Sequence, residues 1–266
     1  MNPRDTHDMK EKPLVSIVTP SFNQSRYLEE TIQSVLSQTY PNLEYLVIDG
    51  GSTDGSVDII QRYAAELAYW VSEPDRGQSD ALNKGFQIAR GDVLAWLNAD
   101  DIYYPTAVQE AVEYLVAHPG IGLVYGDCDL IDEKGQKIGQ FDARQTNYHR
   151  LMQGRGNIPQ PAAFWQRSLW DRLGPLDTSF QFAMDYDLWL RFARASEIRY
   201  VPQRWAGFRM HEGTKTSQIF ERCWPEMKKA HQKQGGWVVS IFTWRYMLRK
   251  YLGSTWRWMR GVWSRS

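Results

Sequence analysis

The sequence predicts an α/β protein with a mainly parallel central sheet and helices on both of its faces. Short apolar runs of strand length alternate with stretches in which apolar residues recur at helical spacing, and short loops join the two. One such run, Val93–Leu97, is apolar throughout, as expected of a strand in a parallel sheet whose two faces are both covered. This alternation favours the α/β class.

The first half of the chain alternates strand and helix. Val15–Thr19 predicts a strand, and helical spacing then extends to Gln38 through Tyr27, Leu28, Ile32, Val35 and Leu36. Leu43–Ile48 predicts a second strand, which the turn residues Asp49–Gly55 end. A helix over about 56–65, a short strand at 69–71, a helix over about 80–89 and the strand Val93–Leu97 complete this half.

The second half is less regular. We expect a helix over 105–118, a strand that ends at Tyr125-Gly126, and a hairpin turn at 132–135 because its Asp-Glu-Lys-Gly sequence is rich in turn residues. Apolar spacing over Tyr186–Ala193 predicts an amphipathic helix with Asp185 at its start.

Composition bounds the class of protein. With 266 residues, 42% hydrophobic and 14% aromatic, the chain can form one large domain, or one domain with an appendage. Its formal net charge of zero argues against a nucleic-acid partner. Two distant cysteines, Cys128 and Cys223, indicate neither a disulfide framework nor a zinc site, so a reducing, cytoplasmic location is expected.

The N-terminal residues, 1–12, are polar and mixed in charge, which predicts a flexible segment without a signal peptide. No run of about 18 apolar residues is present, so no conventional membrane span is expected.

The most informative motif is the abrupt end of the Val93–Leu97 run in Asn98-Ala99-Asp100-Asp101. Ligands of open α/β sheets collect outside the carboxyl ends of strands. Two adjacent carboxylates there repel each other unless a cation or hydrogen-bond donors compensate, which favours a divalent ion that carries a phosphate-bearing substrate. Alternatively, Asp101 caps the helix that starts near Pro105.

Two more polar segments follow strands at the same predicted edge, Pro20-Ser21-Phe22-Asn23 and Asp49 with its glycine loop. Glycines there let a backbone approach a ligand closely, and the Asp49 carboxylate can accept hydrogen bonds from a ribose or a base. Turn chemistry alone also explains Asp49. The GxGxxG pattern of dinucleotide-binding folds is absent after the first strand, so a dinucleotide site is not supported.

Six segments together resemble the inverting glycosyltransferases of family 2, of the type that builds bacterial cell-surface polysaccharides. The resemblance covers about residues 13–220 and implies the GT-A fold, a Rossmann-like central sheet flanked by helices. In chain order, the matching segments are Val18–Gln24, Ile48–Gly55, Ser72–Gly77, Ala81–Gly85, Leu97–Asp101 and Met184–Arg191.

The resemblance also implies roles for single residues. Pro20, Ser21 and Asp49 would line the base and ribose pocket of a nucleoside-diphosphate-sugar, and Arg76 its far wall. Asp100 matches the last aspartate of the family's DXD motif, which holds a divalent cation, Mn²⁺ or Mg²⁺, on the diphosphate. Asn98 stands where that motif begins with an aspartate.

Two more residues complete the implied site. His211 falls where some relatives place a histidine near the metal, although a lone histidine is more often a structural one. Asp185 matches the family's catalytic base, and inversion at an anomeric carbon requires one base for the acceptor hydroxyl, on a glycan or a lipid-linked acceptor. Spacing alone also fits a helix N-cap at Asp185.

The last segment, 221–266, predicts an amphipathic helical tail. Its basic residues lie on one side of a helix and its aromatic and aliphatic residues on the other, which is the pattern of a helix that binds an anionic membrane surface. We therefore expect a peripheral protein on the inner face of the cell membrane. Packing of the aromatic face on the catalytic domain is the alternative.

Two other functions remain open from sequence. One is a catalytically weak module that binds sugar nucleotides or glycans, against which Asp185 counts. The other is a nucleotidyltransferase, which usually carries a glycine-rich, basic loop after its first strand, and Pro20-Ser21-Phe22-Asn23 is not such a loop.

Overall fold

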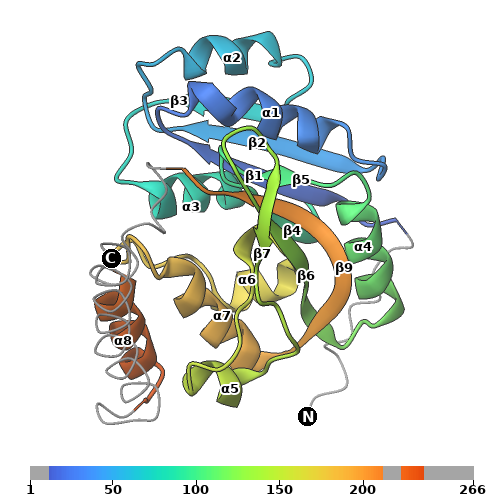
Figure 1. Cartoon of the computed structure of the whole chain (residues 1–266), viewed down its shortest axis with the longest axis vertical. Coiled ribbons are helices and arrows are strands. Elements are labelled where there is room, and N and C mark those ends of the chain that lie inside the picture. Colours follow the sequence, from blue (N-terminus) through green and yellow to red (C-terminus); the bar gives the residue numbers. More distant parts are fainter. Residues whose placement is uncertain (1–11, 212–222, 237–266) are drawn as a thin grey trace, which may run out of the picture.

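The computed structural model describes residues 12–211 and 223–236 (Figure 1). The first half contains β1 (Val15–Ser21), α1 (Ser25–Leu36), β2 (Leu43–Asp49), α2 (Ser56–Arg62), β3 (Tyr69–Ser72), α3 (Gln78–Ile88) and β4 (Val93–Trp96). The second half contains β5 (Ile102–Tyr103), α4 (Ala107–Ala117), β6 (Ile121–Ile131), β7 (Lys137–Gln140), α5 (Tyr148–Met152), the 3₁₀ turn η1 (Gln160–Ala162), β8 (Ala163–Gln166), α6 (Arg167–Leu173), α7 (Met184–Ala195), β9 (Glu197–Arg209) and α8 (Trp224–Lys233).

The strands of the described residues form one sheet in the order β3-β2-β1-β4-β8-β6-β9-β5, with β7 paired to β6. The first four run parallel, as predicted, and β8 joins them antiparallel to the second half. Ser21 stands opposite Asp49, and Asp49 stands opposite Ser72. The carboxyl ends of β1, β2 and β3 therefore meet at one edge of the sheet.

Successive side chains of a strand point to opposite faces of the sheet. Because both faces carry apolar side chains here, helices cover both. Val15 and Ile17 of β1 pack with α1, α2 and α4, whereas Val18 packs with α3, α6 and α7. Figure 1 shows α1 and α2 on one side of the parallel strands and α3 and α7 on the other.

Aromatic packing fixes α7 against β4. The rings of Trp96 and Trp189 stack with centroids 5.6 Å apart, and Trp165 meets both edge-on. All three indoles are almost fully buried. Buried aromatic groups of this size contribute strongly to core packing, so α7 is held to the strand that leads to Asn98.

The prediction that a strand ends at Tyr125-Gly126 is wrong, because β6 continues to Ile131. Gly126 marks an irregularity in the pairing with β9, where the register shifts between Tyr125 and Asp127. A Cβ at Gly126 would lie 2.6 Å from the carbonyl oxygen of Gln203, so glycine permits the close approach of two strands here rather than a strand end.

The described part of the expected tail, 223–236, packs on the domain. Trp224 and Ala230 of α8 are buried, and α8 lies beside α7 (Figure 1). Residues 237–266, which hold most of the predicted basic and aromatic helix, lie outside the described residues, as do 1–11. Within 12–211 and 223–236, no helix combines the length and apolarity needed to cross a bilayer.

The loops after β1 and β2 hold each other through hydrogen bonds. The Asn23 side chain accepts from the Thr53 N–H, and the Asn23 N–H donates to Ser52 Oγ. The Asp54 carboxylate accepts from the N–H of Ser25, at the start of α1, and from the N–H and hydroxyl of Ser56. One aspartate therefore caps the starts of two helices.

Replacement of Asp54 by Ala should lower the free energy of unfolding by about 1 kcal/mol at pH 7, since both helix starts lose an acceptor. Partial burial opposes ionisation, but hydrogen bonds from Ser56 and Ser25 prevail and hold the pKa of Asp54 at about 2. A carboxylate with a lowered pKa stabilises the fold above its unfolded pKa. The difference between the two proteins should therefore narrow as pH falls from about 4 towards 2. Urea unfolding of both proteins across this range measures it, and a pH-independent difference would contradict the account.

Candidate active site

Asp49, at the end of β2, is fully buried and organises the glycine loop behind it. Its Oδ2 accepts from the N–H groups of Gly51 (3.1 Å) and Ser52 (2.8 Å) and from the hydroxyl of Ser72 (2.7 Å). Its Oδ1 accepts from the Ser52 hydroxyl at 2.6 Å. The turn chemistry expected at Asp49 is present, and the side chain ties the ends of β2 and β3 together.

Close backbone approach explains the two glycines that follow. A Cβ at Gly50 would lie 2.7 Å from Oδ2 of Asp75, and Gly51 has a φ of +83° against Pro74. The loop after β3 thus packs on the loop after β2. Arg76 lies on this second loop with its side chain 78% exposed and pairs with Asp80 at 2.7 Å.

Pro20 and Ser21 form the end of β1, next to the glycine loop after β2. The Ser21 carbonyl accepts from the Gly50 N–H at 2.8 Å, and both residues are buried. The Ser21 hydroxyl is enclosed and has no hydrogen-bond partner among the described residues. A buried hydroxyl without a partner is uncommon, and here it lies at a strand end where a ligand is expected.

Amide side chains surround the end of β4. Asn98 accepts from Gln78 Nε2 at 2.6 Å and donates to Asp101 Oδ2 and Gln160 Oε1, each at 3.0 Å. Gln160 in turn donates to the Trp96 carbonyl. A carboxylate at position 98 would face the carboxylate of Asp101, so asparagine suits this network where the DXD motif has aspartate.

The adjacent aspartates of the motif point to different partners. Asp100 Oδ2 lies 3.1 Å from Nε2 of His211, and both side chains are largely buried. Asp101 is fully buried and accepts from the Arg209 N–H and from Asn98. Burial, followed by the neighbouring Asp100 carboxylate, raises the pKa of Asp101 well above its usual value. Asp101 does not cap α4, whose N-cap residue is Thr106.

Arg209, at the end of β9, is a fully buried cation that sequence reasoning missed. Its Nε donates to the Asp100 carbonyl (2.8 Å), and its terminal nitrogens donate to the carbonyls of Asp132 and Glu133 and to the carboxylate of Glu30 (2.6 Å). Its guanidinium also lies 4.9 Å from the ring centre of Tyr27, which packs on His211. Arg209 therefore holds the main chain that carries Asp100.

Asp185 lies in the first turn of α7, half-buried, and its Oδ1 accepts from the Tyr186 N–H. A chain of contacts joins this turn to β4: Met184 Sδ accepts from the Ser79 hydroxyl, and Gln78, beside it at the start of α3, bonds Asn98. The structure thus places the starts of α3 and α7 and the end of β4 side by side.

Cys223 lies near the start of α7. Burial, followed by the carboxylates of Asp185 and Glu226, raises the pKa of its thiol to about 12. The thiol is therefore protonated at neutral pH and is a poor nucleophile.

The donor atoms of Asp100 and His211 fit a metal site that a ligand completes. No group of three or more His, Cys, Asp or Glu side chains suited to a metal occurs in residues 12–211 and 223–236. Ions such as Mg²⁺ commonly use one or two protein ligands, with phosphate oxygens and waters supplying the rest, and Mn²⁺ also accepts imidazole. One carboxylate and one imidazole 3.1 Å apart agree with such a site.

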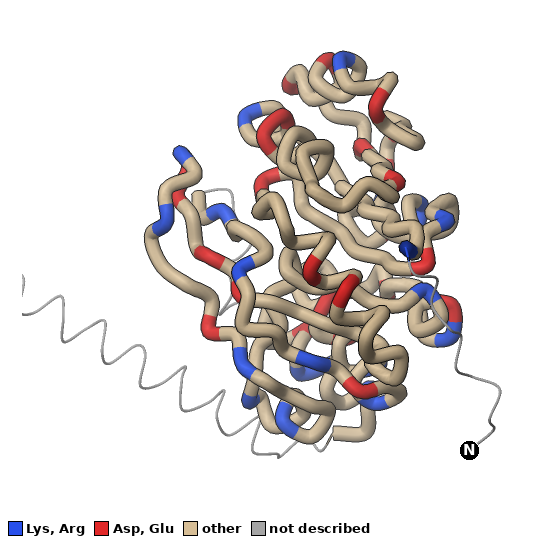
Figure 2. The backbone as a smooth tube through the Cα atoms, turned by 90° about the vertical axis from the view of Figure 1, so that its right-hand side faces the viewer, with Lys and Arg blue, Asp and Glu red and all other residues tan. Residues whose placement is uncertain are grey.

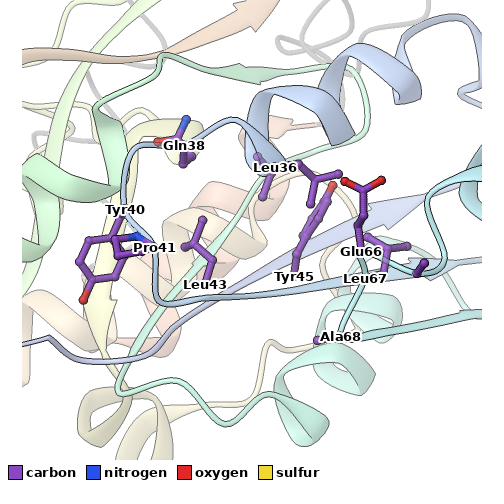
Figure 3. Close-up of a pocket in the computed structure, with 11 residues that line it drawn as sticks. Leu36, Gln38, Tyr40, Pro41, Leu43, Tyr45, Glu66, Leu67 and Ala68 are labelled. Carbon is purple, nitrogen blue, oxygen red and sulfur yellow. The ribbon is translucent and has the colours of Figure 1, made fainter.

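A hollow of about 440 Å³ lies elsewhere, lined by residues that include Tyr40, Leu43 and Leu67 (Figure 3). Leu43 begins β2 and Asp49 ends it, so the hollow and the site lie at opposite ends of a strand about 20 Å long.

Figure 2 shows acidic and basic residues interspersed along the described chain.

Sequence comparison assigns the family. Residues 16–173 match the model described as Glycosyl transferase family 2. An uncharacterized glycosyltransferase of Rickettsia prowazekii is 31% identical over 242 residues, which cover 84% of this chain and 74% of that protein. Another, of Mycobacterium tuberculosis, is 34% identical over 192 residues, covering 71% and 72%. The chain belongs to glycosyl transferase family 2.

Solved structures show the same fold. A fragment of S. aureus TarS in complex with UDP-GlcNAc has a TM-score of 0.66 at 16% identity and covers 82% of this chain, which spans 64% of that fragment. The mannosyltransferase PcManGT from Pyrobaculum calidifontis, in complex with GDP-Man and Mn²⁺, has a TM-score of 0.65 at 22% identity, with coverages of 87% and 67%. The fold is GT-A, as the sequence predicted, and the protein is a glycosyltransferase.

Proposed function

We propose that this glycosyltransferase moves a sugar, with inversion, from a nucleoside-diphosphate-sugar to a hydroxyl of a glycan or lipid-linked acceptor. One observation carries the proposal: Asp100 pairs with His211 in the segment after β4, and hydrogen bonds through the start of α3 join that segment to the start of the helix that bears Asp185. The nucleotide-sugar complexes of the two structural neighbours support this class of donor.

The ends of β1 and β2 form the proposed nucleotide pocket, with Pro20, Ser21 and Asp49 at its base and Arg76 at its far wall. The enclosed Ser21 hydroxyl supports this placement, since a ligand would supply its missing partner. The Asp49 oxygens already accept four hydrogen bonds from the protein. Asp49 therefore acts in the pocket mainly by holding the glycine loop in place.

Asp100 and His211 are the proposed ligands of a divalent cation, Mn²⁺ or Mg²⁺. When bound, such an ion neutralises negative charge that develops on the leaving diphosphate. Arg209 fixes the main chain of Asp100, and Tyr27 packs on the ring of His211, so the protein holds both side chains in place.

Asp185 is the proposed general base. Its carboxylate takes the proton of the acceptor hydroxyl as the hydroxyl oxygen attacks the anomeric carbon, and the nucleoside diphosphate leaves from the opposite face. Its place in the first turn of α7 stabilises the ionised form, because the helix N-terminus carries partial positive charge.

The cellular location is a proposal from sequence alone. We infer attachment to the inner face of the cell membrane through basic and aromatic residues of 237–266, which lie outside the described residues.

Replacement of Asp185 by Asn should lower kcat about 10²- to 10⁴-fold while the Kd of the donor stays within about twofold, because only the base is lost. Release of nucleoside diphosphate from sugar nucleotides such as UDP-GlcNAc and GDP-Man, with water as acceptor, measures the rate. Asp171→Asn, an exposed change on α6, is the matched control. Near-normal kcat in the Asp185 variant would refute the assignment, and release of a sugar 1-phosphate in place of the nucleoside diphosphate would indicate nucleotidyl transfer instead.

Replacement of Asp100 by Ala should abolish the gain in nucleoside-diphosphate affinity that Mn²⁺ or Mg²⁺ gives, because the carboxylate is the proposed anchor of the ion. Calorimetric titration with and without metal tests this, with Asp171→Ala as the control. A metal-dependent gain that survives in the Asp100 variant would place the ion elsewhere.

A further inference from the structure

Helix α8 contacts the start of α7 through the carboxylate of Glu226, a residue outside the motifs of the family resemblance. Glu226 accepts hydrogen bonds from three consecutive backbone N–H groups: Gln181 at 3.0 Å, Phe182 at 2.7 Å and Ala183 at 3.0 Å. Ala183 is the N-cap residue of α7, and no side chain of its own caps that helix. Glu226 supplies, from another helix, an acceptor for the N–H groups that lead into α7.

Two lysines extend this contact along the same segment. Lys233 Nζ lies 2.8 Å from Asp177 and 3.5 Å from the buried carboxylate of Asp187. Lys229 donates to the Ser179 hydroxyl at 3.0 Å. Residues 177–187 are thus fixed by α8 at both ends, with Asp185 between the contacts.

The segment also contacts α3 and Gly77, the residue just before α3. Leu176 exchanges two hydrogen bonds with Asn83 of α3, and the Ser79 hydroxyl reaches Met184. The Gln181 side chain lies beside Gly77, where an added Cβ would be 3.4 Å from its Oε1. The backbone that Glu226 holds therefore lies between α8 and the proposed donor site.

We propose that Glu226 is a positioning residue for sugar transfer, which fixes the backbone at 181–183 and thereby aims the side chain of Asp185 at the acceptor. This inference rests on the proposed role of Asp185 as the base. Hydrogen bonds to an ionised acceptor are strong and directional, and a base displaced by about 1 Å loses much of its effect.

The body of α7 is anchored by residues other than Glu226. Trp189 and Phe192 anchor the body of the helix in the aromatic core. Loss of the carboxylate therefore releases the first turn, which carries Asp185, while the rest of α7 stays packed. Variants at position 226 are expected to fold.

A double-mutant cycle in the full-length chain tests the proposal. Glu226→Ala should lower kcat for nucleoside-diphosphate release about 10- to 100-fold, with the donor KM within about twofold. Glu226→Gln should retain more activity, since its amide oxygen still accepts. In an Asp185→Asn background, Glu226→Ala should lower kcat further by less than about twofold, because both changes remove the same function.

Two controls separate this role from general destabilisation. Glu197→Gln removes an exposed carboxylate on β9, and Gln232→Ala alters the exposed face of α8, so both should leave kcat unchanged. An unchanged kcat in Glu226→Ala would overturn the proposal. So would a decrease in kcat by the same factor whether position 185 is Asp or Asn. If Asp185→Asn itself keeps its activity, the proposed base is wrong, which is a distinct result.

Discussion

The buried guanidinium of Arg209 is the interaction on which the proposed metal end of the site depends. A cation removed from water is stable only if its donors are matched. Here they reach the carbonyl of Asp100, the turn between β6 and β7, and Glu30 of α1. The same residue, through its main-chain N–H, holds Asp101. Three parts of the chain, the segment after β4, the β6–β7 turn and α1, therefore meet at one side chain, and the carboxylate of Asp100 faces His211.

The two parts of the proposed site, the nucleotide pocket and the start of α7, are held in place in different ways. Hydrogen bonds through Asn23, Asp49 and Asp54 join the ends of β1, β2 and β3 directly, so contacts among these strand ends hold the proposed nucleotide pocket together. The start of α7 instead depends on α8, which comes after the last strand. In the proposed site, the nucleotide pocket therefore lies in the first half of the chain, and the proposed base is positioned by the C-terminal part.

Patterns local in sequence predicted the parallel strands, the glycine loops and the strand-end aspartates correctly, because each depends on a few neighbouring residues. Partners distant in sequence were not predictable. Arg209 and Glu30 are 179 residues apart and show no periodic signal. Glu226 resembles any surface glutamate of an amphipathic helix until the fold places it at the amides of 181–183. Gly126 was misjudged because a glycine at a β-irregularity and one at a strand end look alike in sequence.

The stereochemistry of the first product tests the central claim most directly. Proton NMR, recorded early during turnover of an α-linked sugar nucleotide with water as acceptor, distinguishes the two anomers of the released sugar. A single base at Asp185, opposite a leaving group held at Asp100, predicts that the β anomer forms first. Initial release of the α anomer would contradict direct displacement and the proposed arrangement of the site.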